Sequence, residues 1–223
     1  MKMKIFGHRG SMGLYTENTI YSIQMALDEG VHGLEIDMHM SKDGELIIHH
    51  DEDIKNGGLI KDLTLEQISS FNVGGHPIPT LQNVLNLLKG KDIELNIELK
   101  TSIVSYKGIE EKTLACVAAS GFDGKVIYSS FHLPTILRIK ELDPQAYIAF
   151  LTIFPLTHPI DYIQTFALDA IHISINTLLL TMEHFDGVYD KLRVWPVNEK
   201  KDMQLLANKG VAAIITDYPS RFL

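Results

Sequence analysis

The sequence predicts an α/β fold, a single closed (βα)8 barrel of the TIM type that takes up residues 1–223. Three observations lead to this prediction. Short apolar runs rich in Ile, Val and Leu alternate with segments of helical spacing, which is the order of parallel strands and crossover helices. These runs are too many for a typical open sheet. The first run also ends in His8-Arg9-Gly10, without the glycine-rich phosphate loop that follows the first strand of many open sheets.

Apolar runs and capping signals define the elements along the chain. Apolar residues recur at helical spacing between the runs, as in Ile20–Leu27. Thr64 with Gln67 resembles a capping box, and Thr80 is placed to cap a helix that continues to Leu88. The predicted strands are Lys4–Gly7, Gly33–Met38, Leu46–His50, Ile93–Leu99, Lys125–Ser129, Tyr147–Thr152, Ala170–Ile175, Arg193–Val197 and Ala212–Thr216.

The second strand is expected to turn back in a β-hairpin. Residues 41–44 are too few for a parallel crossover, and Asp-Gly between two apolar runs favours a tight turn. A loop at Asp43 and Gly44 pairs His50 with Asp37, whereas a loop one residue earlier pairs it with Glu35. In both registers His50 faces the same side as the two carboxylates. The glycine-containing segment that follows, Asp51–Pro79, is predicted to be a lid insertion over one end of the barrel.

Composition and charge exclude several classes of protein. Acidic residues outnumber basic ones by 28 to 20, for a net charge of −8, whereas nucleic-acid binders carry a basic surplus for phosphate contacts. No apolar run approaches the length of a membrane span, and the start of the chain lacks the apolar stretch of a secretory signal. We therefore expect a cytoplasmic protein with no nucleic-acid partner and no stable membrane insertion.

Polar residues that a strand core would avoid gather at three predicted strand ends. In a β/α barrel the catalytic groups occupy the carboxyl ends of the strands. Glu35 and Asp37 share one strand face, and two neighbouring carboxylates repel each other unless a cation is near. Together with Glu98 they offer three oxygen donors, which suits one divalent ion, Mg²⁺ or Ca²⁺. The residues of the three clusters are His8, Arg9, Glu35, Asp37, Asn96, Glu98 and Lys100.

These motifs, in this order, resemble the glycerophosphodiester phosphodiesterase family, whose barrel is related to that of phosphatidylinositol phospholipase C. Each matching piece is short, but the resemblance extends over essentially the whole chain. The matching segments are His8-Arg9-Gly10, Glu17-Asn18-Thr19, Glu35-x-Asp37, Asp43-Gly44, His50-Asp51, Pro79-Thr80-Leu81, Asn96-Ile97-Glu98-Leu99-Lys100, Trp195-x-Val197-Asn198 and Ile214-Ile215-Thr216-Asp217-Tyr218-Pro219.

The resemblance implies metal-dependent hydrolysis of small glycerophosphodiesters to an alcohol and sn-glycerol 3-phosphate. It implies that His8 and His50 form the general acid–base pair, and that Arg9 and Lys100 hold the phosphate. The other implied site residues are the ligands of the divalent ion, Glu35, Asp37 and Glu98, the residue that orients Arg9, Glu17, and two walls of the alcohol pocket, Phe131 and Trp195.

Several alternatives stay open at this point. The chain departs from the family pattern at residues 52–55, at Gln82-Asn83 and at Pro196, which border the pocket, so the accepted alcohol is not defined. The choice between Mg²⁺ and Ca²⁺ is also open, as is the choice between attack by water and a cyclic phosphate route. His39, on the face of Asp37, and His132, at another strand end, are weaker candidates for the site.

Two other functions compete with the hydrolysis of soluble diesters. One is a lysophospholipase D or a phospholipase C-like enzyme that acts on lipids, for which Phe150–Leu156 would supply an apolar mouth. The other is a non-catalytic barrel that binds glycerophosphate compounds. The presence of both histidines and all three carboxylates favours an enzyme.

Overall fold

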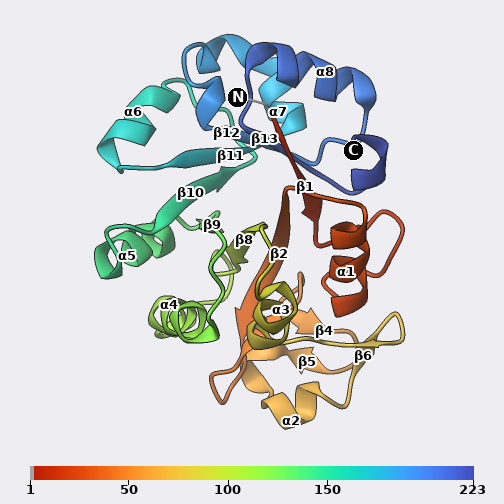
Figure 1. The fold of residues 1–223 in the computed structure, drawn as a ribbon. Coiled ribbons are helices and arrows are strands. Elements are labelled where there is room, and N and C mark those ends of the chain that lie inside the picture. Colours follow the sequence, from red (N-terminus) through yellow and green to blue (C-terminus); the bar gives the residue numbers. More distant parts are fainter. Residues whose placement is uncertain (1–2) are drawn as a thin grey trace.

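The computed structural model describes residues 3–223, and its central element is a closed ring of eight parallel strands. The ring runs β1-β13-β12-β11-β10-β9-β8-β2 and closes through the pairing of β1 with β2. Figure 1 shows the helices arranged around the outside of these strands. The predicted fold class is therefore confirmed. The strands are β1 (Lys4–His8), β2 (Gly33–Met40), β8 (Glu94–Leu99), β9 (Val126–Ser130), β10 (Tyr147–Thr152), β11 (Ala170–Ser174), β12 (Leu192–Trp195) and β13 (Ala213–Thr216).

Each crossover between neighbouring strands of the ring contains a helix. In the described part of the chain, a single 3₁₀ turn at Pro219–Arg221 follows β13, where an eighth helix would stand. Thr80 begins one helix as predicted, in a capping box with Asn83. No helix among the described residues has both the length and the apolar character to cross a membrane. The crossover helices are α1 (Ile20–Asp28), α3 (Leu81–Leu88), α4 (Ile109–Ser120), α5 (Leu133–Leu142), α6 (Pro159–Thr165), α7 (Ile175–Leu180) and α8 (Lys200–Lys209).

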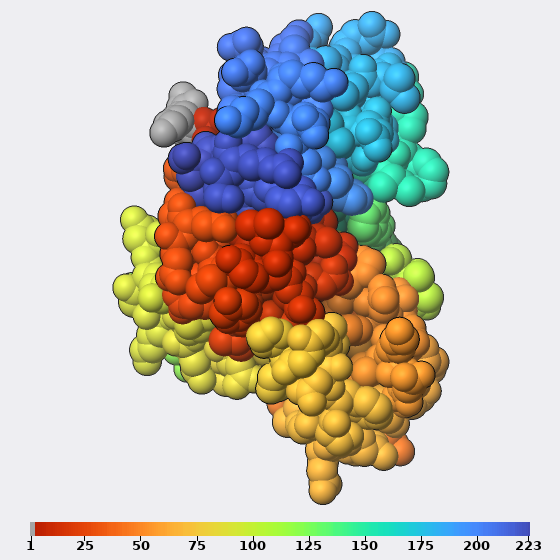
Figure 2. Space-filling model, turned by 90° about the vertical axis from the view of Figure 1, so that its right-hand side faces the viewer, coloured from red at the N-terminus to blue at the C-terminus, as the bar shows by residue number. Residues whose placement is uncertain are grey.

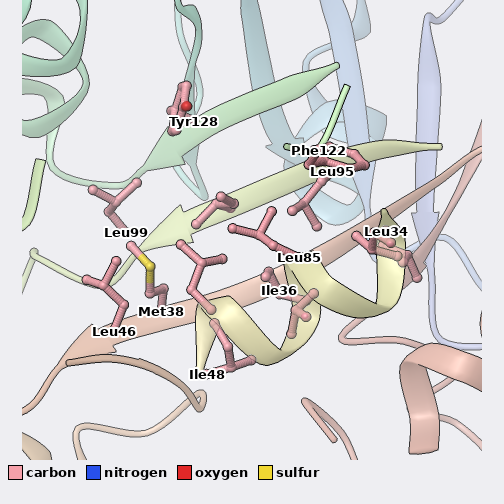
Figure 3. Close-up of a cluster of buried hydrophobic side chains, with 14 of the residues drawn as sticks. Leu34, Ile36, Met38, Leu46, Ile48, Leu85, Leu95, Leu99, Phe122 and Tyr128 are labelled. Atoms are coloured by element: carbon pink, nitrogen blue, oxygen red, sulfur yellow. The ribbon is translucent and has the colours of Figure 1, made fainter. Parts of the chain in front are cut away.

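The outward strand faces and the helices form the largest apolar core. Along β2, Leu34, Ile36 and Met38 alternate with residues that face the barrel interior, as the two-residue repeat of a strand requires. They pack in one buried cluster with Leu85 of α3 and Leu95 of β8 (Figure 3). Burial of both strand faces explains why these strands read as nearly continuous apolar runs.

The barrel interior is closed at the amino ends of the strands. Glu94 forms ion pairs there with Lys4 and Arg193, and the Arg193 Nη2–Glu94 Oε2 distance is 3.3 Å. The Arg193 guanidinium also lies over the ring of Phe6, 4.8 Å from its centroid. The pocket described below lies at the opposite, carboxyl ends of the strands, where the polar clusters are.

The hairpin after β2 is present, but its register differs from both predicted ones. β3 (Leu46–Ile48) pairs antiparallel with β2, and Met38 lies opposite Ile48. The loop has three residues, not two, because the Ser41 N–H bonds the Glu45 carbonyl at 2.9 Å and Gly44 adopts φ 88°. A three-residue loop with glycine in the left-handed region is a common hairpin connection. Both predicted pairings of His50 are therefore wrong, since β3 ends before that residue.

The insertion that follows the hairpin is a folded lobe with its own small core, not a loose segment. Figure 2 shows its residues, coloured orange to gold, protruding at one end of the molecule. The predicted capping box of Thr64 and Gln67 begins its helix α2 (Leu65–Ile68). Its other elements are β4 (Asp53–Ile54), β5 (Gly58–Leu59), a 3₁₀ turn at Ile60–Asp62, β6 (Asn72–Val73) and β7 (His76–Pro77). Five buried isoleucines form its core: Ile47, Ile54, Ile60, Ile68 and Ile78.

We expect Leu85→Ala to lower the free energy of unfolding by about 2–5 kcal/mol, because it leaves a cavity between α3 and the sheet. Urea unfolding followed by circular dichroism measures this. Leu180→Ala is the matched control, since Leu180 is 86% exposed and its loss should change stability by less than about 0.5 kcal/mol. Equal effects of the two substitutions would contradict the described core.

Candidate active site

Three carboxylates meet at the carboxyl ends of β2 and β8. Asp37 lies directly opposite Glu98 in the parallel pairing of these strands, and Glu35 is two residues before Asp37 on the same face. One oxygen from each of the three side chains lies within 4.8 Å of the others. All three residues are buried. They form a compact set of hard oxygen donors, of the kind that binds a divalent cation.

Burial and mutual repulsion change the pKa values of these carboxyl groups. Burial, followed by the charges of Asp37 and Glu98, raises the pKa of Glu35 well above its usual value. Burial and the charge of Asp37 likewise raise the pKa of Glu98 to about 7. Burial also tends to raise the pKa of Asp37, but Arg9 and Lys100 outweigh that effect and lower it. The two basic side chains thus compensate only part of the negative charge, and a divalent cation would compensate the rest.

Arg9 is held over the cluster by its own strained backbone and by three acidic residues. Its φ of 50° lies in the left-handed region, a conformation that costs about 1–3 kcal/mol for a residue with a side chain. Its N–H donates to Glu35 Oε2 at 3.1 Å, and its Nη1 donates to both carboxylate oxygens of Glu17 at 3.0 Å. Its Nε lies 3.0 Å from Asp37 Oδ2 in an ion pair without hydrogen-bond geometry.

Lys100 approaches the same carboxylates from the end of β8. Its Nζ lies 3.1 Å from Glu98 Oε1 and 3.7 Å from Asp37 Oδ1. Asn18, a buried residue with φ 55°, holds the other side of Asp37 by donating its Nδ2–H to Oδ2 at 2.9 Å. Asn18 was quoted in the sequence only as part of a motif, because nothing local indicates that it reaches β2.

His8 is oriented by a carboxylate from the last strand of the ring. Its Nδ1 lies 2.6 Å from Asp217 Oδ1, and its Nε2 is 3.9 Å from Glu35 Oε2. Asn198 in turn donates to Asp217 Oδ2 at 2.7 Å and accepts the Asp217 N–H at 3.0 Å. Because Asp217 accepts the Nδ1 hydrogen, the neutral ring keeps its lone pair on Nε2. The sequence prediction included neither Asp217 nor Asn198 as site residues, although both follow strand ends.

His50 reaches the site from the bend after β3. Its Nδ1 lies 2.7 Å from Asp51 Oδ1, so its Nε2 is left for other partners. The predicted hairpin registers, which placed His50 opposite Asp37 or Glu35, are wrong. The chain leaves the strand pairing after Ile48, and the His50 side chain still lines the same pocket as His8. His132 does not line this pocket. It lies directly before α5, and its Nδ1 is 3.1 Å from Thr135 Oγ1.

These groups surround a pocket of about 520 Å³ that has a charged side and an apolar side. Phe131 and Trp195 lie on the apolar side, with ring centroids 5.7 Å apart in an edge-to-face arrangement. Of the predicted site residues, Glu17 and Asp37 do not line the pocket: Glu17 contacts Arg9, and Asp37 contacts both Arg9 and Lys100. Asn96, which the sequence placed in a polar strand-end cluster without a role, also lines it, as do Leu151 and Ile215, which were not predicted. The lining residues are His8, Arg9, Glu35, His50, Asn96, Glu98, Lys100, Phe131, Leu151, Trp195 and Ile215.

Comparisons with known proteins all find the same family. The model of the glycerophosphoryl diester phosphodiesterase family matches residues 8–221. The chain is 35% identical to a glycerophosphodiester phosphodiesterase of Caldanaerobacter subterraneus subsp. tengcongensis, over 100% of this chain and 97% of that protein. It is 34% identical to one from Bacillus altitudinis, over 98% and 96% of the two chains.

Solved structures share the fold. A glycerophosphodiester phosphodiesterase from Parabacteroides distasonis superposes with a TM-score of 0.86 at 25% identity, covering 99% of this chain and 94% of that one. An Oleispira antarctica phosphodiesterase, solved in complex with the product sn-glycerol-3-phosphate, has a TM-score of 0.84 at 24% identity, with 99% and 95% covered.

We expect a divalent ion to stabilise the protein more at about pH 8 than at about pH 6, because carboxylates bind metal only after losing their protons. With the pKa of Glu98 at about 7, affinity for Mg²⁺ or Ca²⁺ should fall about tenfold from pH 8 to pH 6. Thermal unfolding with and without each ion measures the effect.

Glu98→Gln is the control for this prediction, because an amide cannot titrate. It should weaken the stabilisation and flatten its pH dependence. An equal rise in melting temperature at both pH values in the unsubstituted protein would argue against binding at the three carboxylates.

Proposed function

Because the chain belongs to the glycerophosphoryl diester phosphodiesterase family, we propose that it hydrolyses soluble glycerophosphodiesters to an alcohol and sn-glycerol 3-phosphate. The observation that carries this proposal is that two imidazoles, two basic side chains and two carboxylates of the three-carboxylate cluster line one pocket. Such groups suit the hydrolysis of a phosphodiester. Its anionic oxygens repel a nucleophile, which positive charge offsets, and its alkoxide is a poor leaving group unless an acid protonates it.

The carboxylates Glu35, Asp37 and Glu98 would hold one divalent cation, Mg²⁺ or Ca²⁺. They fit such an ion because all three donors are oxygens that lie close together. Burial, followed by the charge of Asp37, raises the pKa of Glu35 and of Glu98, and a cation would stabilise both as carboxylates. A bound ion would supply charge compensation at the phosphate oxygens. Arg9 and Lys100, both in the pocket wall, would donate hydrogen bonds to the same oxygens.

His8 and His50 would move the protons. Each has its Nδ1 against a carboxylate, Asp217 or Asp51, which fixes the ring and leaves Nε2 for the substrate. One imidazole would take the proton of the nucleophile, and the other would protonate the departing alkoxide. The same pair serves direct attack by water and attack by the neighbouring glycerol hydroxyl, which gives a cyclic phosphate that water then opens.

A lipid-directed activity is the second candidate, supported by the chain that leaves β10. Leu151 lines the pocket, and Ile153 and Phe154, two and three residues further along the chain, are 50% and 71% exposed. These exposed apolar side chains, which follow the carboxyl end of β10, would suit the acyl chain of a lysophospholipid. We favour the soluble substrate because the charged groups of the pocket can act on the phosphodiester without an acyl chain being bound.

We expect purified, metal-stripped protein to release sn-glycerol 3-phosphate from glycerophosphocholine, glycerophosphoethanolamine or glycerophosphoglycerol only after Mg²⁺ or Ca²⁺ is restored. Glu35→Ala should abolish the release. Faster cleavage of lysophosphatidylcholine than of glycerophosphocholine would favour the lipid-directed enzyme. Tight binding of glycerol phosphate without any turnover, in folded protein, would indicate a binding barrel.

We expect His8→Ala and His50→Ala each to lower kcat by about 10²–10⁴-fold, the usual contribution of a general acid or base. Both variants should keep the melting temperature within a few degrees, since each ring borders the pocket and is not part of the apolar core. His158→Ala, at an exposed position beside α6, is the matched control and should be unchanged. Wild-type turnover in either variant would remove that histidine from the mechanism.

A further inference from the structure

The backbone of His50 lies just beyond the end of β3. β3 ends at Ile48, so His50 has no partner in the sheet. The His49 N–H still bonds the Asp37 carbonyl at 3.1 Å. One residue later, the carbonyl of His50 accepts a hydrogen bond from the ring of His39, with Nε2 at 3.1 Å. The peptide that carries the His50 imidazole is therefore fixed by a side chain instead of a strand.

His39 is a completely buried residue of β2 whose two ring nitrogens both have partners. Nε2 faces the His50 carbonyl, and Nδ1 lies 2.9 Å from the hydroxyl of Tyr106. A carbonyl can only accept, so the ring hydrogen sits on Nε2 and the lone pair on Nδ1 accepts the phenol hydrogen. The two contacts thus select one tautomer.

Tyr106 brings in a third element, the loop between β8 and α4. It is 7% exposed, and burial raises the pKa of its phenol, so the hydroxyl keeps the hydrogen that it donates. Its ring packs against that of His39 with centroids 5.9 Å apart and planes at 70°. A continuous chain of contacts therefore runs from this loop through β2 to the bend that carries His50.

We propose that His39, with its tautomer fixed by Tyr106, is a positioning residue that holds the backbone of His50 so that its imidazole faces the substrate. This inference rests on the proposed function, in which His50 transfers a proton. Proton transfer needs heavy atoms within hydrogen-bond distance, and a shift of about 1 Å at a catalytic group can cost about 10²-fold in rate. A buried histidine with a purely structural role would affect stability without this effect on rate.

The test compares His39→Leu, His39→Gln and Tyr106→Phe by steady-state kinetics on glycerophosphocholine. His39→Leu removes both hydrogen bonds and should lower kcat about 10²-fold with KM within about twofold. His39→Gln keeps an N–H near the position of Nε2 and should restore part of the loss. Tyr106→Phe keeps the ring packing and should lower kcat about 3–10-fold, the equivalent of one hydrogen bond.

Tyr128→Phe is the matched control, since Tyr128 of β9 is buried in the same apolar cluster as Tyr106, but among the described residues only Tyr106 bonds the ring of His39. It should leave kcat unchanged. Melting temperatures of all variants separate a rate effect in folded protein from loss of folding, and Tyr106→Phe, which removes a single hydroxyl, keeps the test possible if His39→Leu does not fold.

A double-mutant cycle with His50→Ala decides whether His39 acts through His50. The double variant should be no slower than His50→Ala alone, because the group being positioned is already gone. Additive losses, or wild-type kcat in folded His39→Gln and Tyr106→Phe, would overturn the inference. Failure of the proposed function would look different, since the unsubstituted protein itself would then release no sn-glycerol 3-phosphate.

Discussion

The structure of the site depends on the confinement of three carboxylates at the ends of two adjacent strands. Parallel pairing places Asp37 opposite Glu98, and the strand repeat places Glu35 on the same face, so their mutual repulsion cannot be relieved by rotation of a flexible loop. Arg9 adopts a strained backbone conformation beside them, and Lys100 follows on β8. Both compensate part of the charge, and both remain directed at the pocket where a phosphate would add more negative charge.

Closure of the barrel determines which groups meet there. His8 and Asp217 are 209 residues apart, and they touch because β1 pairs with β13 on one side and with β2 on the other. The same closure brings Glu94 and Arg193 together at the opposite end and seals it with an ion pair. One end of the ring is thus filled by charged side chains that pair with each other, and the other end carries the polar residues that line the pocket.

The barrel fold and several residues of the pocket were predictable from local patterns in the sequence. Apolar runs alternating with helical spacing are imposed by the burial of strands on both faces, and they gave the barrel. Polar residues at strand ends have no place in an apolar core, so His8, Glu35 and Glu98 could be assigned to a site at the carboxyl ends, and these residues do surround one pocket. The family resemblance agrees with the comparisons, which place the chain in the same family.

The sequence by itself determined the alternation of strands and helices, the polar residues at the strand ends and the family, because each is carried by short segments of the chain. Only the tertiary structure decided the partners of those groups. The hairpin register depended on a three-residue loop closed by Ser41 and Glu45, and the tautomers of His8 and His39 depended on Asp217 and Tyr106. Such contacts join residues far apart in the sequence, so their distances are defined only once the ring of strands has closed.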